Sequence, residues 1–163
     1  MGAGSPRWLD DREQRAWSSL QLMHLRLDAA LARQLLRDSG LSLQDYVVLV
    51  ALTGAPEGRM RAFELGRLLG WEKSRLSHHL TRMAQRGLVA RELCEVDRRG
   101  AWVVVTPEGR RAIEAAAPGH VAEVRRLFVD RLSPRELDTI AAVAERVLAV
   151  LDAEEGKGAP PGP

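Results

Sequence analysis

The clearest candidate for a binding surface is the segment between Gly70 and Gly87, whose apolar residues have the spacing of an amphipathic helix. On a helical wheel that advances about 100° per residue, Leu80 and Met83 fall beside Leu76 on the inward face. The outward and flanking positions carry hydroxyl, imidazole and cationic side chains: Lys73, Ser74, Arg75, Ser77, His78, Thr81 and Arg82. Such groups can donate hydrogen bonds to base edges and phosphates, which indicates a helix suited to the major groove of duplex DNA.

Different side chains on this outward face suit different parts of a duplex. Arg75 is the candidate for a base contact, because a guanidinium can donate two hydrogen bonds to the edge of guanine. Lys73, Ser74 and Ser77 suit phosphates or sugars, whose contacts set the register of a protein on DNA.

A second cationic site follows in the sequence Asp97-Arg98-Arg99-Gly100. It lies between two segments that we expect to be extended, at about 88–95 and 101–105, and Gly100 supplies the backbone freedom of a tight turn. A hairpin of this kind can place arginine in the minor groove, where negative potential is concentrated. Arg98 and Arg99 are therefore candidate DNA contacts, although alone they would be ordinary solvated hairpin charges.

Three helices are predicted to precede the hairpin and to support the outward-facing helix. An apolar stripe predicts a long first helix over about 9–38, which Gly40 can end in a left-handed cap. The stripe consists of Leu20, His24, Leu27, Leu31 and Leu35. Ser42 can cap a second helix, which we expect although the run 46–50 favours a strand by propensity. A short helix follows at about 61–69.

Two more helices are predicted after the hairpin. Thr106-Pro107 reads as the start of a helix to about residue 131, with a bend at Pro118-Gly119. The capping box Ser133-Pro134-Arg135-Glu136 opens the last helix. Its apolar side comprises Leu137, Ile140, Ala144, Val147 and Leu151. The first and last helices together carry more apolar surface than a small central lobe can cover, which favours burial in a dimer over an intramolecular core.

Composition indicates a soluble, helix-rich protein with a basic middle third. Apolar residues make up 45% and aromatic residues 4% of 163 residues, with a formal net charge of +2. Between Arg59 and Arg111 there are 12 basic and 6 acidic residues, whereas the remainder holds 12 and 16. The single Cys94 fits a reducing compartment, and we expect a cytoplasmic protein. Glu92 and Glu95 flank Cys94, which favours a structural thiol over a redox-active one.

Several classes of protein lack support in the sequence. The stretch from Met1 to Trp8 has no apolar signal region, and the longest apolar run, 46–52, is too short to span a bilayer. No phosphate loop or nucleophile motif is present, so we expect neither an enzyme nor a cofactor. The adjacent His78 and His79 diverge by about 100° around a helix and have no acidic or thiol ligand at suitable spacing. We therefore expect His78 to face DNA, His79 to lie at the core margin, and no metal site.

Two motifs resemble the winged helix-turn-helix region of the multiple antibiotic resistance regulator (MarR) family. The first comprises residues 64–83 and 86–89. The second, Asp97-Arg98-Arg99 followed by 103–109, is similar to the wing motif Asp-x-Arg that leads to Leu-Thr-x-x-Gly, with Val105 where leucine is usual. The resemblance extends over about 20–151. It implies a mainly α fold with a two- or three-stranded β-wing and terminal helices that form a dimerisation region.

The resemblance also implies a function. The chain would be a sequence-specific transcriptional regulator that represses by occupying a promoter, as a homodimer on a pseudo-palindromic site with half-sites about one helical turn apart. Arg99 would enter the minor groove, and Asp97 would orient nearby arginines through a salt bridge. Family members bind small, often anionic, aromatic effectors. Candidate residues for such a pocket are Trp17, His24, Tyr46 and Trp71, each of which has simple packing as its alternative role.

These inferences predict a division of the chain. Residues 42–106 would form the winged helix-turn-helix DNA-binding domain, and 9–41 and 107–154 the helical dimerisation region. Residues 1–8 and 155–163 would be disordered ends, since both are rich in Gly, Pro or both. The main rival function is a winged-helix module for protein contacts that does not bind DNA, and salt-dependent DNA binding would distinguish the two.

Overall fold

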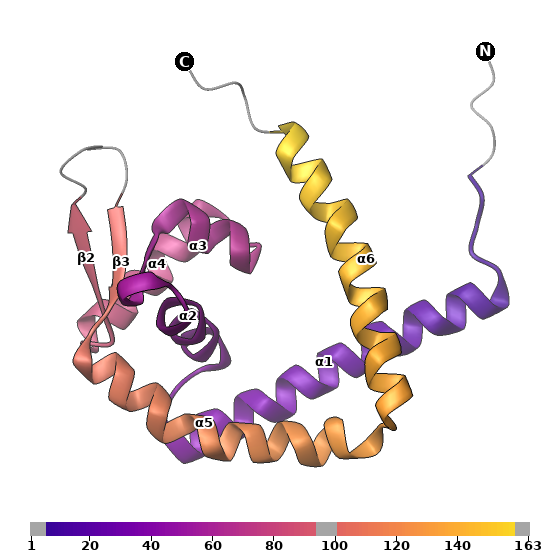
Figure 1. The fold of residues 1–163 in the computed structure, drawn as a ribbon, viewed down its shortest axis with the longest axis horizontal. Helices are drawn as coiled ribbons and strands as arrows, with labels where there is room; N and C mark the ends of the chain where they lie inside the picture. The colour runs from indigo at the N-terminus through magenta and orange to yellow at the C-terminus, as the bar shows by residue number, and fades with distance from the viewer. Residues whose placement is uncertain (1–5, 94–100, 159–163) are drawn as a thin grey trace. The chain divides into compact units, whose positions relative to one another are not determined.

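The computed structural model describes residues 6–93 and 101–158, which form a mainly α fold with one small antiparallel sheet (Figure 1). The helices are α1 (Asp11–Ser39), α2 (Leu43–Gly54), α3 (Ala62–Leu69), α4 (Lys73–Gln85), α5 (Pro107–Leu127) and α6 (Pro134–Gly158), and the strands are β1 (Arg59–Arg61), β2 (Val89–Leu93) and β3 (Ala101–Val105). The chain divides into two compact units, up to Val121 and from Ala122 onward. The predicted fold class is confirmed.

The first helix begins and ends at residues that satisfy its unpaired backbone groups. Asp10 caps the start of α1 by accepting hydrogen bonds from backbone N–H groups, and Glu13 completes the capping box. Gly40 ends the helix with φ of 68°, a left-handed conformation that favours glycine. The predicted left-handed cap is confirmed.

The strand-like run after Ser42 is helical. Ser42 and Asp45 form a reciprocal capping box at the start of α2. Val48, Leu49 and Leu52 are completely buried on this helix. Tertiary packing therefore outweighs the β propensity of the run, and the helical prediction is confirmed.

A tight turn joins α3 to α4. Gly70 ends α3 with φ of 62°, and the backbone N–H of Trp71 donates to the Gly66 carbonyl over 2.9 Å. A Cβ on Gly66 would lie 3.3 Å from the Trp71 carbonyl oxygen, so little space is left for a larger residue there. This turn fixes the start of α4 against α3.

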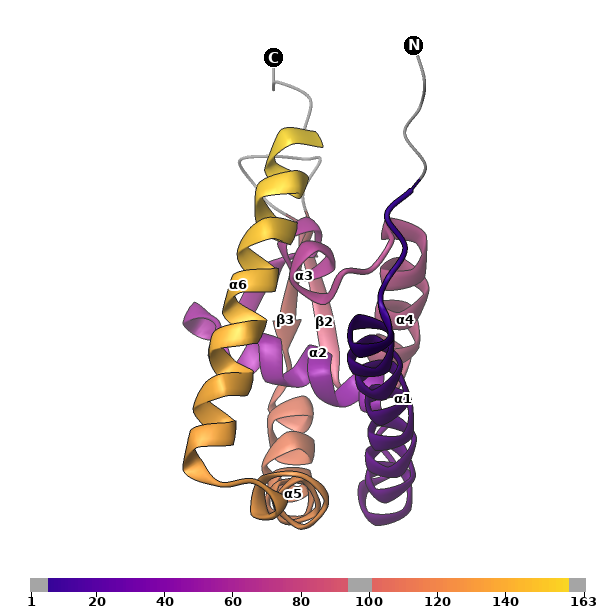
Figure 2. The ribbon, with the colours of Figure 1, turned by 90° about the vertical axis from the view of Figure 1, so that its right-hand side faces the viewer.

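The sheet has the order β1-β3-β2, so β3 is its central strand. Figure 2 shows β2 and β3 side by side; the antiparallel pairing runs from Val89 opposite Val105 to Leu93 opposite Ala101. The sequence prediction missed β1 as a strand, because three residues are too few to show alternation. Its pairing with β3 gives the third strand that the fold class allowed.

Thr106 and Gly109 attach the start of α5 to the chain just before β2. The Thr106 hydroxyl donates to the Gly87 carbonyl over 2.5 Å and also accepts from the Gly109 N–H. A Cβ on Gly109 would lie only 2.0 Å from the Leu88 carbonyl oxygen, so this position requires glycine. The wing strands and α5 are therefore held in a fixed register.

One hydrophobic core supports these elements. It includes residues from α1, α2, α3, α4, β2, β3 and α5. Its completely or almost completely buried side chains are Leu35, Leu41, Val48, Leu49, Leu52, Leu65, Leu80, Met83 and Val103. The inward residues that the helical wheel assigned to α4 all belong to this core.

The last two helices differ slightly from their predicted extents. Helix α5 continues without interruption through Pro118 and ends at Leu127, and a 3-10 turn follows at Val129–Arg131. The Ser133 capping box is present at the start of α6. This helix continues to Gly158, so 155–158 are helical although the glycine-rich composition predicted disorder from 155. Residues 159–163 lie outside the described ranges.

Large apolar side chains remain exposed on the N-terminal half of α1 and along α6. On α1 they are Trp17, Leu20, Leu22, Met23 and Leu25, of which Leu25 is 67% exposed. On α6 they are Ile140, Val143, Val147, Leu148, Val150 and Leu151. Within residues 6–93 and 101–158, no helix has the length and apolar character needed to cross a membrane.

Candidate nucleic-acid interface

The outward face of α4 is exposed to solvent. All seven predicted contact residues of this helix are exposed, whereas Leu76, Leu80 and Met83 are buried. His79 is also buried, at the core margin where the wheel placed it. We call the exposed set, Lys73, Ser74, Arg75, Ser77, His78, Thr81 and Arg82, the α4 face. Contact between the α4 face and DNA remains a prediction.

An arginine from the wing strand β2 extends this surface. Arg91 donates from its guanidinium to the Ser77 carbonyl over 2.7 Å and lies 3.4 Å from the Thr81 hydroxyl. The Thr81 hydroxyl in turn donates to the Ser77 carbonyl over 2.9 Å. Arg91 was missed from sequence because its partners lie 10 and 14 residues away, and the one available signal was its positive charge on a strand next to the basic hairpin.

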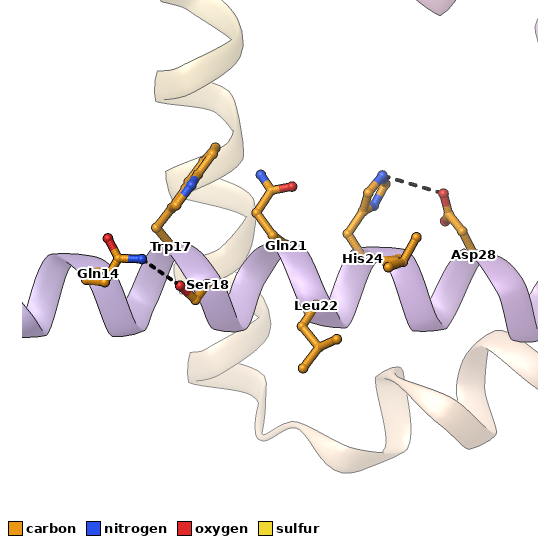
Figure 3. A pocket seen from close by; sticks show the side chains of 8 residues that line it. Gln14, Trp17, Ser18, Gln21, Leu22, His24 and Asp28 are labelled. Atoms are coloured by element: carbon orange, nitrogen blue, oxygen red, sulfur yellow. Dashed lines mark hydrogen bonds and ion pairs between the residues drawn. The ribbon is translucent and has the colours of Figure 1, made fainter. Parts of the chain in front are cut away.

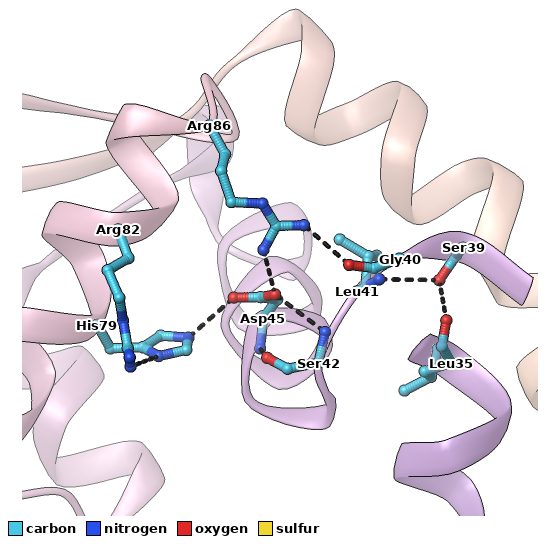
Figure 4. Close-up of polar contacts among 9 residues, drawn as sticks. All are labelled: Leu35, Ser39, Gly40, Leu41, Ser42, Asp45, His79, Arg82 and Arg86. Atoms are coloured by element: carbon cyan, nitrogen blue, oxygen red, sulfur yellow. Dashed lines mark hydrogen bonds and ion pairs between the residues drawn. The ribbon is translucent and has the colours of Figure 1, made fainter. Parts of the chain in front are cut away.

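A buried carboxylate in α2 holds the other end of α4 (Figure 4). The Arg86 guanidinium donates to Asp45 over 2.6 Å and to the Gly40 carbonyl over 3.0 Å. Asp45 is almost completely buried, whereas about half of Arg86 is exposed. This bond spans 41 residues of sequence and ties the end of α4 to the α1–α2 turn.

Asp45 also faces His79, and the ionisation of both groups responds to their burial. The nitrogen Nε2 of His79 lies 3.1 Å from Asp45 Oδ1 but makes no hydrogen bond of good geometry, so the contact is electrostatic. Burial raises the pKa of Asp45, but hydrogen bonds from Ser42 and Arg86 outweigh it and leave the pKa below its ordinary value. Burial lowers the pKa of His79 and outweighs the attraction of Asp45. An ionised Asp45 beside a neutral His79 follows.

The contact with Arg82 determines which nitrogen of the neutral His79 imidazole carries the proton. Its guanidinium lies 3.3 Å from His79 Nδ1 and can only donate, so Nδ1 accepts and the ring proton is on Nε2. Figure 4 shows Arg82 and Asp45 on opposite sides of the ring. His79 thus links the cationic α4 face to the buried carboxylate beneath it.

The wing-tip residues cannot be placed. Cys94, Asp97, Arg98 and Arg99 all lie in 94–100, outside the described ranges, so their predicted roles remain predictions. The strands β2 and β3 that flank this segment are present at the predicted positions. Among the described residues, no group of three or more His, Cys, Asp or Glu side chains could hold a metal ion.

The four candidate effector residues do not line one hollow. Trp17 and His24 do share a surface hollow on α1, with Gln21 on the same side of the helix (Figure 3). His24 Nε2 lies 3.5 Å from Asp28 there. Tyr46 and Trp71 do not line this hollow.

Tyr46 and Trp71 each pack against a different histidine. Tyr46 is buried with its ring centroid 4.3 Å from that of His120, whose Nδ1 lies 3.3 Å from the Gln34 amide oxygen. Trp71 packs against His79. Both side chains therefore pack within the fold, which is the alternative role that the sequence analysis gave them.

A tight helix-turn-helix with an exposed cationic second helix and an adjoining three-stranded sheet defines a winged-helix protein. Residues 39–100 match the MarR family. The chain is 39% identical to AbsC, a MarR family transcriptional regulator from Streptomyces coelicolor, with a TM-score of 0.85 over 91% of this chain and 99% of that one. This chain belongs to the MarR family of transcriptional regulators, which are not enzymes.

Two further solved structures are similar to this chain. Sco3205, a MarR family transcriptional regulator from the same organism determined in complex with DNA, is 37% identical, with a TM-score of 0.84 over 89% of this chain and 91% of that one. Sco5413, another regulator of that organism, is 22% identical with a TM-score of 0.74, over 89% of this chain and 98% of that one, and shows the shared fold.

Proposed function

We propose that this chain represses transcription by binding a pseudo-palindromic site in duplex DNA as a homodimer. The observation that carries the proposal is the α4 face, whose hydroxyl, imidazole and cationic groups are all exposed on a helix anchored to the core. A helix of this kind fits the major groove, and its cations neutralise phosphates. The 37% identical relative was determined in complex with DNA, which supports the same ligand here.

The exposed apolar side chains of α1 and α6 support the homodimer. Leu20 and Leu25 on α1 are 51% and 67% exposed, and Val147 and Leu151 on α6 are 54% and 49% exposed. Exposed apolar rows of this extent mark association surfaces in soluble proteins. A symmetric dimer would present two α4 faces and so match a two-fold related DNA site. Arg98 and Arg99 would add minor-groove contacts from each wing, and Asp97 would orient them.

Regulation by a small aromatic or anionic effector is part of the proposal. Such a ligand would act by favouring an arrangement of the dimer whose two α4 faces no longer match successive grooves. Trp17 and His24 share a hollow whose indole and imidazole suit an aromatic ligand, and Asp28 lies beside His24 there. Equilibrium binding of aromatic carboxylates, followed by the affinity of the loaded protein for DNA, tests this part separately.

The experiment for the main proposal is selection from random duplex DNA, followed by a salt titration. The expected selected consensus is symmetric, with half-sites about one helical turn apart. Affinity should fall about 10³- to 10⁵-fold between 50 and 200 mM salt if six to ten phosphates are contacted. No enrichment of any sequence, or affinity independent of salt, would favour the rival role in protein contacts.

A further inference from the structure

The guanidinium of Arg75 is held over an aromatic ring. Its central carbon lies 4.7 Å from the centroid of the Trp71 ring, within the range of a cation–π contact. Arg75 is exposed in the first turn of α4, and it forms no ion pair with any residue that the structure describes. Its charge therefore remains available to a ligand, while its side chain already packs on the Trp71 ring.

Trp71 is itself anchored from two directions. Its ring packs edge-to-face on His79, with centroids 5.2 Å apart and an interplanar angle of 85°. His79 in turn lies against the buried Asp45, with Nε2 3.1 Å from Oδ1. The backbone N–H of Trp71 donates to Gly66, which closes the turn between α3 and α4. The indole is thus connected to the core of the protein through both its ring and its backbone.

We propose that Trp71 is a positioning residue that preorganises Arg75 for contact with DNA, an inference that rests on the proposed function. Stacking on a ring face leaves the in-plane N–H donors of a guanidinium free for a base edge or a phosphate. A long side chain that is already ordered loses less conformational entropy on binding. Trp71 acts through Arg75 and needs no DNA contact of its own.

A double-mutant cycle on the selected DNA duplex tests this coupling. Trp71→Leu keeps an apolar side chain but removes the aromatic face, and should weaken DNA binding about five- to tenfold. In the Arg75→Ala background the same substitution should change affinity less than about twofold, because no guanidinium remains to be positioned. Trp71→Phe, which restores a ring face, should recover most of the lost affinity.

The matched control is Lys73→Ala, which removes another exposed cation of the α4 face. Trp71→Leu should keep its full five- to tenfold effect, about the same as in wild type, in the Lys73→Ala background. An equal effect in the Arg75→Ala and Lys73→Ala backgrounds would mean that Trp71 merely supports α4, and would overturn the inference. Absence of DNA binding by the wild-type protein would instead contradict the proposed function itself.

A measurement on the free wild-type protein keeps the inference testable if Trp71→Leu does not fold. Protons above an aromatic face are shifted upfield by its ring current, so the Arg75 side-chain protons should resonate upfield of their random-coil positions. Arg75→Lys assigns these signals. Random-coil positions for Arg75 in the folded protein would show that the side chain does not rest on Trp71, and would overturn the inference.

Discussion

Two regions of the molecule differ in how they bury apolar side chains. One is the region that carries α4, and the other consists of the exposed terminal helices. Between α2 and β3, apolar side chains fill one core, and buried Asp45 has cationic and imidazole partners. Along α6 and the first half of α1, large apolar side chains such as Val147 and Leu25 are about half exposed or more. The first region is buried within a single chain, whereas the second exposes the apolar surface that the proposed dimer would cover. In the proposed function, the first region would recognise DNA and the second would assemble the dimer.

The largest effect should come from a cavity in the hydrophobic core that supports α4. Leu49 is fully buried in α2, so Leu49→Ala removes buried methyl groups and leaves a cavity. We expect a loss of about 2–5 kcal/mol in the free energy of unfolding, measured by urea denaturation. A loss below about 0.5 kcal/mol would show that this core is not closely packed.

A charge on the exposed apolar row of α6 should break assembly and leave the core intact. Val147→Asp places a carboxylate where we expect the partner chain, and desolvation of that charge should raise the dimer dissociation constant at least about tenfold. Sedimentation velocity across a concentration series measures it. Ala142→Asp, on the opposite side of α6, is the matched control and should leave assembly unchanged. Equal behaviour of the two variants would contradict the proposed interface.

A smaller effect should appear as a pH dependence of the folding stability, which arises from two histidines. Burial lowers the pKa of both His79 and His120, so the folded protein prefers their neutral forms. Stability from this preference is full above pH 6.5 and is lost as pH falls through the lower folded-state pKa values. Around His79 the charged neighbours are Asp45, Arg82 and Arg75.

Replacement of both histidines by glutamine should flatten the stability profile below pH 6.5, as followed by denaturation midpoints. The single variants apportion the effect between His79 and His120. Asp45 acts in the same direction but only at lower pH: its folded-state pKa lies below 3.8, so its contribution is present above that value and is lost as pH falls further. An unchanged slope in the double variant would show that these imidazoles do not control acid stability.

Local patterns were sufficient to predict the helices but not the contacts between them. The caps at Gly40 and Ser42, and the two faces of α4, follow from residue type and a period of 3.6, so the sequence predicted them. The bond between Asp45 and Arg86 joins residues 41 apart, and no periodicity reports such a pair. Arg91 was missed for the same reason. Tyr46 and Trp71 were grouped by residue type, whereas the fold sends them to different histidines.

The most direct test of the account compares an arginine of the α4 face with an arginine of α1 on the selected duplex. Arg75 lies on the α4 face and Arg33 is an exposed arginine of α1, so each alanine variant removes one positive charge from the surface. Arg75→Ala should weaken binding by about 1–3 kcal/mol and relax the preference for one base pair, while Arg33→Ala should have little effect. Equal affinities for the two variants, with the base preference intact, would contradict recognition by the α4 face.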